Sequence, residues 1–318
     1  MAGEFIAIIA VLTFVISNVI FKRTEHEASP TFINFVRTAI GTLTFFIFSM
    51  IFNVFFHIFL LPWELWMILF ISFIFGQIIG DTAYFIAQKD LGTTMALAVS
   101  MIFPLITFIL SMMFLNEPFD LRIVFSLILV GLGIYIIGKS KVSINLPPKT
   151  IIEPKNNHLE LSKSRIKAIS FGILAAFGWA IGLVIIDYAT NEINRILLIE
   201  ELSSVIGNVI RFPFALIILL SMVLRENYKT KSVINTKIKR SGNTWSLLII
   251  GAIIGTSIGA YVYTEAARVA GATIMALIAS ASPLFSLPLT YFINKEKITK
   301  FGFVGVILTI LGVIVIIF

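Results

Sequence analysis

The chain has 318 residues, of which 58% are hydrophobic and only 13% charged, with a mean hydropathy of +1.01. Soluble domains carry about 25% charged residues, so this composition excludes an ordinary soluble protein. The formal net charge of +7 lies in the loops without interleaved aromatic residues, and it does not indicate a nucleic-acid partner. The chain contains no cysteine, which excludes disulfides, thiolate catalysis and cysteine-ligated metals.

Ten apolar runs follow one another along the chain, each close to the roughly 20 residues that cross a hydrocarbon core of about 30 Å. We expect ten transmembrane helices at about 4–21, 31–53, 65–87, 93–115, 119–138, 167–187, 197–224, 245–266, 272–293 and 299–318. The first run is about as long as a signal peptide core, but no basic region precedes it, and we count it as a retained span. The sequence therefore predicts an all-α, multi-pass integral protein of the plasma membrane.

The two halves of the chain repeat each other. The segment GQIIGDTAYFIAQKDLGTT at Gly76 matches GTSIGAYVYTEAARVAGAT 179 positions later, and NFVR at Asn34 matches NVIR at an offset of 174. A polar linker, residues 139–166 with three prolines, separates a first repeat (1–138) from a second (167–318). Five spans per repeat make the second repeat enter the membrane from the opposite side, and such inverted repeats are a common plan of secondary transporters.

Several residues at shared spacing carry a resemblance to a known family. They are the G-D-x-x-Y-F element from Gly80 with the Leu-Gly pair that follows it, Pro104 in the next span, Glu117 and Gly133. In this order, in both halves, they resemble the EamA repeat of the drug/metabolite transporter superfamily. The resemblance implies a ten-helix secondary transporter that moves small metabolites through a cavity between the halves without ATP hydrolysis. It implies no substrate, because the family spans amino acids, sugars, nucleotide-linked sugars and drugs.

The third span carries a polar stripe. Gln77, Asp81, Tyr84 and Gln88 follow at spacings of four, three and four, which places them on one helical face. A carboxylate as deep as Asp81 is costly unless it faces protein or water. Asp81 is either a cavity-facing acid that binds a substrate amine, Na⁺ or a proton, or a structural acid bonded to a neighbouring group. We take it as the coupling residue, and its role is asymmetric because its counterpart is Ala260.

Two arginines occupy corresponding positions in spans two and seven. Arg37 lies near enough to one end of its span to reach the interface, which favours a structural role. Arg211 lies further from either end and is expected to face the bundle or an aqueous path. Each could bind a carboxylate or phosphate, pair with Asp81 or Glu265, or bond carbonyls where the repeats meet. Near the end of span eight, Glu265 and Arg268 predict an i,i+3 ion pair at the interface.

We expect a substrate pocket near the bilayer midplane, where corresponding spans of the two repeats meet. Its predicted lining consists of Gln77, Asp81, Tyr84, Ser100, Trp179, Arg211, Tyr261, Tyr263 and Ser282. An acid with amides and aromatics suits a zwitterionic or cationic solute such as an amino acid or amine, whereas a doubly charged phosphate requires Arg211 to point inward. No Walker A loop, H-E-x-x-H motif or Ser/His/Asp set is present, and we predict no catalytic residue, metal or cofactor.

These features favour a secondary active transporter, an exporter or exchanger of small polar metabolites that works by alternating access. Its partners are a small-molecule substrate, the lipid bilayer and a coupling proton or Na⁺. A nucleotide-sugar or lipid-linked metabolite carrier is the alternative among transporters. An intramembrane lipid-processing enzyme is the alternative from another class. The substrate, the direction of transport and the oligomeric state stay open at this point.

Charge predicts the orientation in the membrane. Loops after odd-numbered spans hold 19 of the 24 Lys and Arg, and the opposite side holds only Arg122, Arg195 and Arg268. By the positive-inside rule, the odd loops are cytoplasmic and both termini lie outside. The family resemblance implies both termini inside, but we follow the charge count because these loops are short enough for the rule to apply. A C-terminal reporter that is active only in the cytoplasm should therefore be inactive, and an active one would contradict this orientation.

Overall fold

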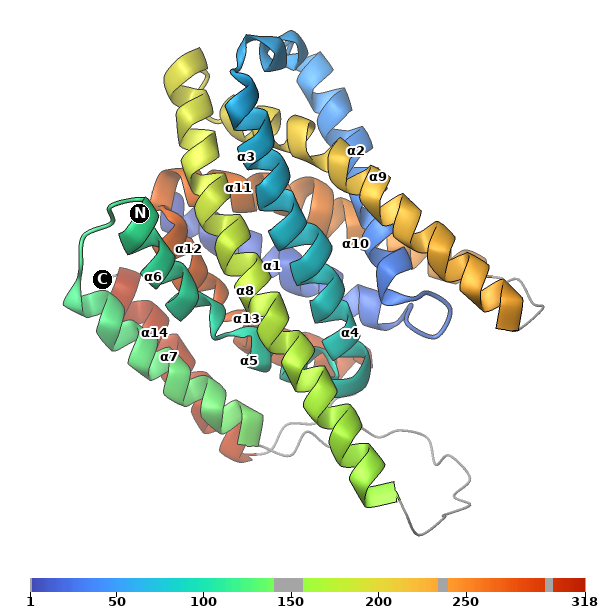
Figure 1. Cartoon of the computed structure of the whole chain (residues 1–318). Coiled ribbons are helices and arrows are strands. Elements are labelled where there is room, and N and C mark those ends of the chain that lie inside the picture. Colours follow the sequence, from blue (N-terminus) through green and yellow to red (C-terminus); the bar gives the residue numbers. More distant parts are fainter. Residues whose placement is uncertain (1, 140–156, 234–239, 295–299, 318) are drawn as a thin grey trace.

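The computed structural model describes residues 2–139, 157–233, 240–294 and 300–317, and every element in these ranges is a helix (Figure 1). The first half contains α1 (Ala2–Lys22), α2 (Pro30–Ile51), the 3-10 helix η1 (Phe55–Leu60), α3 (Trp63–Phe73), the π-helix η2 (Ile74–Asp81), α4 (Thr82–Leu91), α5 (Thr93–Ser100), α6 (Phe103–Phe114) and α7 (Leu121–Lys139). The second half contains α8 (Asn157–Leu197), α9 (Leu202–Val233), α10 (Gly242–Ala252), the π-helix η3 (Ile253–Ile258), α11 (Gly259–Ala270), α12 (Ala272–Ala279), α13 (Ser282–Leu289), the π-helix η4 (Thr290–Asn294) and α14 (Lys300–Ile317).

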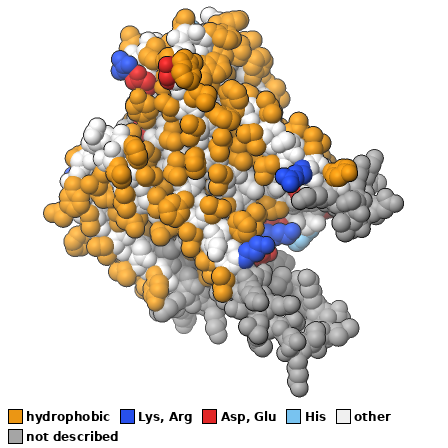
Figure 2. Space-filling view, viewed as in Figure 1, with side chains coloured by type: hydrophobic (Ala, Val, Ile, Leu, Met, Phe, Trp, Pro, Cys, Tyr) orange, Lys and Arg blue, Asp and Glu red, His pale blue; other side chains and the backbone are white. Residues whose placement is uncertain are grey.

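Eight helical segments of the described chain are long and apolar enough to cross a membrane. They are 2–22, 30–51, 63–91, 95–114, 166–197, 202–228, 242–270 and 272–293. Helices α7 and α14 occupy the other two expected positions, and the apolar part of α7 is the shorter stretch Leu121–Gly133. Hydrophobic side chains cover most of the face seen in Figure 2, with charged groups near its margins. The all-α, multi-pass membrane character expected from the sequence is confirmed.

The helices extend further than hydropathy predicts. Helix α8 begins at Asn157, although residues 139–166 were expected to form a linker, and residues 140–156 lie outside the described chain. Helix α9 likewise continues to Val233 beyond the expected end of its span at 224. Hydropathy marks the part of a helix that lies in hydrocarbon, whereas Leu, Glu and Lys favour helix equally well outside it. The apolar pattern therefore predicts the spans better than the helix ends.

Local sequence signals set several helix ends. Ser29 caps α2 by accepting a hydrogen bond from a backbone N–H, and Pro30 follows at the first helical position. Ser241 caps α10 in the same way. Gly92 and Gly271 separate α4 from α5 and α11 from α12 at φ values of 82° and 86°, a conformation that glycine adopts without strain. These two glycines are counterparts in the sequence repeat, so the same break recurs in both halves.

A cluster of charged and polar groups connects the C-terminal end of α1 with the C-terminal end of α4. Lys22 Nζ donates to the Glu25 carboxylate at 2.7 Å and to the carbonyl oxygens of Gln88 at 2.6 Å and Lys89 at 3.1 Å. The end of α1 is thereby fixed to the end of α4. Burial raises the pKa of the Glu25 carboxyl to about 7, and the neighbouring Lys22 ammonium opposes part of that rise.

Small residues let the helices of the two halves approach closely. Helix α1 packs against α10, η3 and α11, and α8 packs against α3, η2 and α4. A Cβ on Gly255 would overlap Ser17, and a Cβ on Gly182 would lie 2.9 Å from Gly76 Cα. Ser17 corresponds to Gly182 at an offset of 165, and Gly76 corresponds to Gly255 at 179. The two crossings are therefore built from corresponding residues, each joining one half to the other.

Two further contacts pair corresponding helices. Helix α2 packs along α9, and α7 packs along α14 on one side of the molecule (Figure 1). Ser126 of α7 donates a hydrogen bond to the carbonyl oxygen of Gly312 in α14 at 2.7 Å. A Cβ at Gly312 would lie 2.7 Å from a methyl group of Val130, so this contact is also close. The pair α7–α14 stands beside the bundle formed by the other helices.

The crossing of α8 over η2 is expected to be sensitive to a single methyl group. In Gly178→Ala, the added Cβ would lie 2.5 Å from the carbonyl oxygen of Phe75 and 3.0 Å from the backbone of Gly80. Overpacking of this kind costs about 1–3 kcal/mol, so the apparent Tm in detergent should fall by several degrees. The matched control is Gly131→Ala in α7, where nothing lies within 4 Å and no loss is expected. Equal Tm values for the two variants would contradict the backbone contact.

Candidate functional site

A cavity of about 120 Å³ lies where the two halves meet. Residues of both halves line it. From the first half they are Ala10, Val11 and Phe14 of α1, Arg37 of α2, Ser72 and Phe73 of α3, Gly76, Gln77 and Asp81 of η2, Met101 at the end of α5 and Phe103 of α6. From the second half they are Trp179, Gly182, Leu183 and Ile186 of α8, Arg211 and Phe212 of α9, Gly255 of η3, Gly259, Ala260 and Tyr263 of α11, Met275 and Ala279 of α12, and Ser282 of α13. Among the described residues, none from α7 or α14 takes part. Corresponding spans of both halves thus contribute walls to one cavity.

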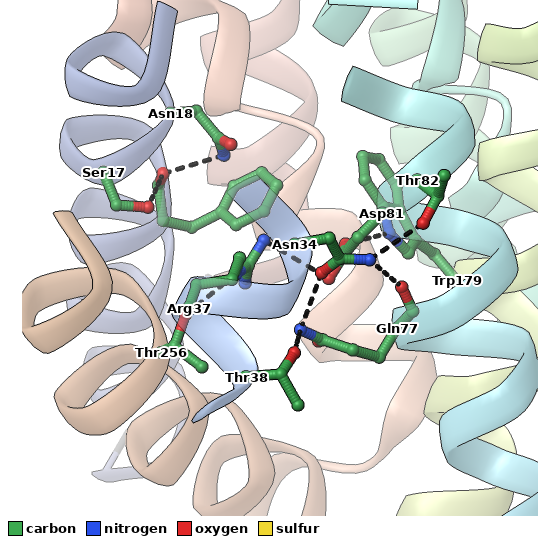
Figure 3. Close-up of polar contacts among 11 residues, drawn as sticks. Ser17, Asn18, Asn34, Arg37, Thr38, Gln77, Asp81, Thr82, Trp179 and Thr256 are labelled. Atoms are coloured by element: carbon green, nitrogen blue, oxygen red, sulfur yellow. Dashed lines mark hydrogen bonds and ion pairs between the residues drawn. The ribbon is translucent and has the colours of Figure 1, made fainter. Parts of the chain in front are cut away.

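A buried ion pair lies at the cavity wall. Arg37 Nη1 is 3.3 Å from Asp81 Oδ2, and the two side chains are only 5% and 7% exposed. Trp179 Nε1 donates to Asp81 Oδ1 at 2.8 Å, and Arg37 Nε donates to Thr256 Oγ1 at 2.8 Å (Figure 3). Because Trp179 and Thr256 belong to the second half, this pair connects the halves as well as α2 and η2. The acid is thus both cavity-facing and bonded to its neighbours.

A polar network fixes the side of η2 next to this pair. Gln77 Nε2 donates to Asn34 Oδ1 at 3.1 Å and to Thr38 Oγ1 at 2.9 Å. Asn34 Nδ2 in turn donates to the carbonyl oxygen of Gln77 at 2.8 Å and to Thr82 Oγ1 at 2.9 Å (Figure 3). In a π-helix the backbone bonds run from i to i+5, which leaves a carbonyl such as that of Gln77 accessible to a side-chain donor. The network holds the π-helical turn that presents Asp81.

Arg211 reaches the cavity from α9 without an acidic partner. Its Nε donates to Asn208 Oδ1 at 2.9 Å, while its Nη atoms lie 3.4 Å from Ser72 Oγ and 3.3 Å from Thr264 Oγ1. The guanidinium carbon also lies 4.8 Å from the centre of the Phe73 ring. Arg211 forms no ion pair with any residue that the structure describes. The direct contacts of this buried cation are therefore with neutral groups and an aromatic face, while Asp81 attracts it only at longer range.

Aromatic rings form much of the apolar wall. Phe14 and Trp179 are counterparts at an offset of 165 and meet edge to face, with ring centres 5.7 Å apart. Phe103 meets Trp179 in a similar arrangement at 6.1 Å. Trp179 therefore does two things: its ring bounds the cavity and its indole N–H orients Asp81.

Six of the nine residues predicted for the pocket line this cavity. They are Gln77, Asp81, Trp179, Arg211, Tyr263 and Ser282. Ser282 donates its hydroxyl to the carbonyl oxygen of Ala279 one turn earlier, so it bounds the cavity while its hydroxyl is already bonded.

The other three predicted residues do not line the cavity. Tyr84 is fully buried against the rings of Phe14 and Trp179, at 6.2 and 5.2 Å between centres, so these two rings lie between it and the cavity. The expected stripe fails here because η2 is π-helical and the chain returns to an α-helix after Asp81, which turns the later residues away. Ser100 is buried and bonds the carbonyl oxygen of Ala96 in its own helix. Tyr261 is half-buried, whereas its neighbour Ala260 lines the cavity.

Sequence reasoning underrated Arg37 and missed Phe14. Arg37 was expected to reach the interface, but it is 4% exposed and pairs with Asp81. The signal was its match to Arg211 within the repeated N-x-x-R element, because an arginine repeated at depth in both halves is costly unless it has a partner. Phe14 could have been found as the counterpart of Trp179. The predicted ion pair between Glu265 and Arg268 is present, with Arg268 Nε donating to Glu265 Oε2 at 2.9 Å.

The lining of the cavity is mostly apolar and carries a few charged and polar groups, as ligand-binding pockets do. Among the described residues there is no group of three His, Cys, Asp or Glu that could hold a metal ion. The charged groups of the cavity are Arg37, Asp81 and Arg211, set in an otherwise apolar and hydroxyl-bearing lining. A multi-pass membrane protein with such a cavity between its halves has the form of a transporter.

The chain belongs to the EamA-like transporter family, whose model matches residues 1–139 and 166–318. The resemblance noted in the sequence is thereby confirmed, and the protein is a membrane transporter of the drug/metabolite type rather than an enzyme.

Individual relatives agree with this family. An uncharacterized transporter of Clostridium kluyveri is 30% identical over 136 residues, which is 42% of this chain and 42% of that protein. An uncharacterized transporter of Archaeoglobus fulgidus is 23% identical over 78% of this chain and 74% of that protein. A solved crystal structure, described only as that of a protein, aligns with a TM-score of 0.68 and 15% identity, over 99% of this chain and 96% of the other. At that identity the likeness concerns the fold alone.

The Arg37–Asp81 pair is expected to carry a large share of stability. Removing one partner of a buried ion pair leaves an uncompensated charge and costs about 3–5 kcal/mol. Asp81→Asn should therefore lower the apparent Tm in detergent clearly. Asp120→Asn, which breaks an exposed pair with Arg122, should change it little.

The double variant Asp81→Asn/Arg37→Gln completes the thermodynamic cycle. It should lose less than the sum of the two single variants, because the second change removes the charge that the first left unpaired. Additive losses, or an Asp81→Asn protein as stable as the wild type, would contradict the pair.

Proposed function

We propose that this protein is a secondary active transporter of small polar metabolites, an exporter or exchanger in the plasma membrane, that works by alternating access. The observation that carries the proposal is the cavity between the two halves, with Asp81 and Arg211 buried in its wall. Charged groups at such depth are costly, and in membrane proteins they mark substrate and ion paths. The substrate binds in this cavity, which opens to each side of the membrane in turn.

Access that alternates between the two sides of the membrane follows from two inverted five-helix repeats. Supporting this, the family model matches two separate stretches of the chain, and helices lie at all ten expected positions. Corresponding residues make corresponding contacts, as Ser17 with Gly255 and Gly182 with Gly76. Each repeat gives its first helix to the other half, so the two crossings are equivalent. When the packing at one crossing loosens and that at the other tightens, the cavity closes to one side of the membrane and opens to the other.

The dimensions of the cavity favour a small substrate. Its volume of about 120 Å³ is below the roughly 300–1,000 Å³ of pockets that hold drug-sized ligands. A nucleotide-sugar would need more room and more cationic groups than the two arginines provide. The cavity volume therefore favours metabolites of the size of an amino acid or amine over nucleotide-sugars and lipid-linked metabolites.

Asp81 is the coupling residue in this proposal. Its carboxylate is shared between the Arg37 guanidinium and the Trp179 indole, which join three helical elements. Uptake of a proton by Asp81 weakens its attraction to Arg37 and loosens the contact between α2, η2 and α8. Binding at one residue thus biases the packing of the halves, as coupling requires.

Exchange in proteoliposomes tests the transport function. Vesicles that contain the full chain are loaded with unlabelled amino acids, aliphatic amines and short carboxylates, and the same labelled compounds are added outside. At least one labelled compound should enter faster than into protein-free vesicles, without ATP, and faster from loaded than from empty vesicles. Rates equal to those of protein-free vesicles for every compound would contradict transport of small metabolites.

The coupling role of Asp81 is tested with the compound that exchanges best. Asp81→Asn should abolish net transport driven by a pH gradient, or remove the pH dependence of exchange, because the amide cannot carry a proton. Size-exclusion chromatography of the variant shows whether it is folded. A folded Asp81→Asn protein with the wild-type rate and pH profile would make Asp81 a structural acid.

A further inference from the structure

We propose that the substrate carries a carboxylate and that Arg211 binds it. The inference rests on the proposed transport function and narrows its substrate class from polar metabolites in general. It separates carboxylates and amino acids, which have this group, from amines, which do not.

The charges of the cavity are unbalanced. Two arginines and one aspartate line it, and Arg37 is the one within ion-pair distance of Asp81. Arg211 makes no ion pair in the described chain. Asp81 also attracts Arg211 at longer range, but one carboxylate cannot neutralise two guanidinium groups, so the lining holds an excess of one positive charge. A buried charge is stabilised when an opposite charge joins it, so the cavity favours a ligand with a negative group.

The internal repeat shows which position accounts for the excess positive charge of the cavity. Arg37 and Arg211 are counterparts at an offset of 174, while the counterpart of Asp81 at an offset of 179 is Ala260. All four residues line the cavity. One half therefore provides an arginine with its carboxylate, and the other half provides the corresponding arginine with an alanine at the position that corresponds to the carboxylate. A carboxylate on the substrate would complete the second pair.

The Arg211 guanidinium keeps donors for such a ligand. An arginine has five N–H groups, and the bonds to Asn208, Ser72 and Thr264 use three of them. The bond to Asn208 is the shortest at 2.9 Å and is made by Nε, so it fixes the plane of the group. The longer contacts of the Nη atoms leave the end of the guanidinium able to bind a carboxylate through two hydrogen bonds.

The charge count also selects among anions. With Arg37 paired to Asp81, a single negative charge neutralises the cavity, whereas a phosphate dianion would leave an excess negative charge. An amine would add a third cation to a lining that already has an excess of one. Leu183, Ile186 and Met275 make the neighbouring wall apolar. The chemistry therefore fits a short aliphatic carboxylate. An amino acid brings the same carboxylate to Arg211, although its ammonium group leaves the net charge of the occupied cavity at +1.

Four probes with similar branched carbon chains test the inference: 4-methylpentanoate, leucine, 3-methylbutylamine and 3-methylbutyl phosphate. The thermal stability of the purified full chain is measured as each probe is titrated. The two carboxylates should raise Tm, and the amine and the phosphate should do so at much higher concentrations. In Arg211→Gln the concentration for half the carboxylate effect should rise about tenfold or more, as expected for loss of a charge-assisted bond.

A second pair of variants keeps the test decisive if Arg211→Gln does not fold. Ala260→Asp and Ala260→Asn introduce side chains of nearly the same size, but only Ala260→Asp adds a second carboxylate to the cavity lining. Ala260→Asp should lose the carboxylate effect on Tm, while Ala260→Asn should retain more of it. Equal losses in the two variants would show a steric effect and would contradict the charge argument.

Other results of these experiments would contradict the carboxylate inference or the transport function. Stabilisation by the amine or the phosphate in preference to both carboxylates would overturn the inference, as would no response to either carboxylate. A carboxylate effect that persists unchanged in a folded Arg211→Gln protein would do the same. If the amine is nevertheless exchanged in proteoliposomes, the transport function stands while the carboxylate inference fails. If nothing is exchanged, the transport function itself fails.

Discussion

The structure depends on how charge is held inside a hydrophobic bundle. Asp81 on η2 is bound by Arg37 of α2 and by the indole of Trp179, and Arg37 also binds Thr256 of η3. These four residues come from both halves of the chain, so one buried pair aligns helices that are far apart in sequence. In a membrane the pair persists because separating it would leave two bare charges in a low dielectric. The cavity takes its shape from this junction.

Around the Arg37–Asp81 pair, the helix contacts of the two halves are similar, whereas the charged residues of the two halves differ. Glycine contacts such as Gly76 with Gly182 recur between corresponding residues, and they bring the backbones of the two halves close together. The arginine of the site is repeated, as Arg37 and Arg211, but its acid is not, because Asp81 has Ala260 as its counterpart. The packing of the two halves is therefore more alike than the charges that they bring to the cavity.

Hydropathy and the internal repeat predicted the helix positions and much of the site, because both depend on residue type and spacing alone. Asp81, Trp179 and Arg211 were predicted to line the pocket from their depth in apolar spans, and all three line the cavity. Tyr84 was placed wrongly, since its predicted stripe assumed a regular α-helix and nothing in the residues Ile74–Asp81 announces a π-helical turn. The partner of Arg37 was left open between Asp81 and Glu265, because depth in a span does not say which neighbouring helix supplies the counter-charge.

Access to the cavity from both sides of the membrane is the central claim, and the absence of native cysteine makes it directly measurable. In Ala279→Cys, a small cavity-lining residue of α12 becomes a thiol. A membrane-impermeant methanethiosulfonate reagent should modify it from either side when the other side is quenched. Ile128→Cys, on the exposed apolar face of α7, should remain unmodified from both. Modification of Ala279→Cys from one side only, under all conditions of substrate and pH, would contradict alternating access.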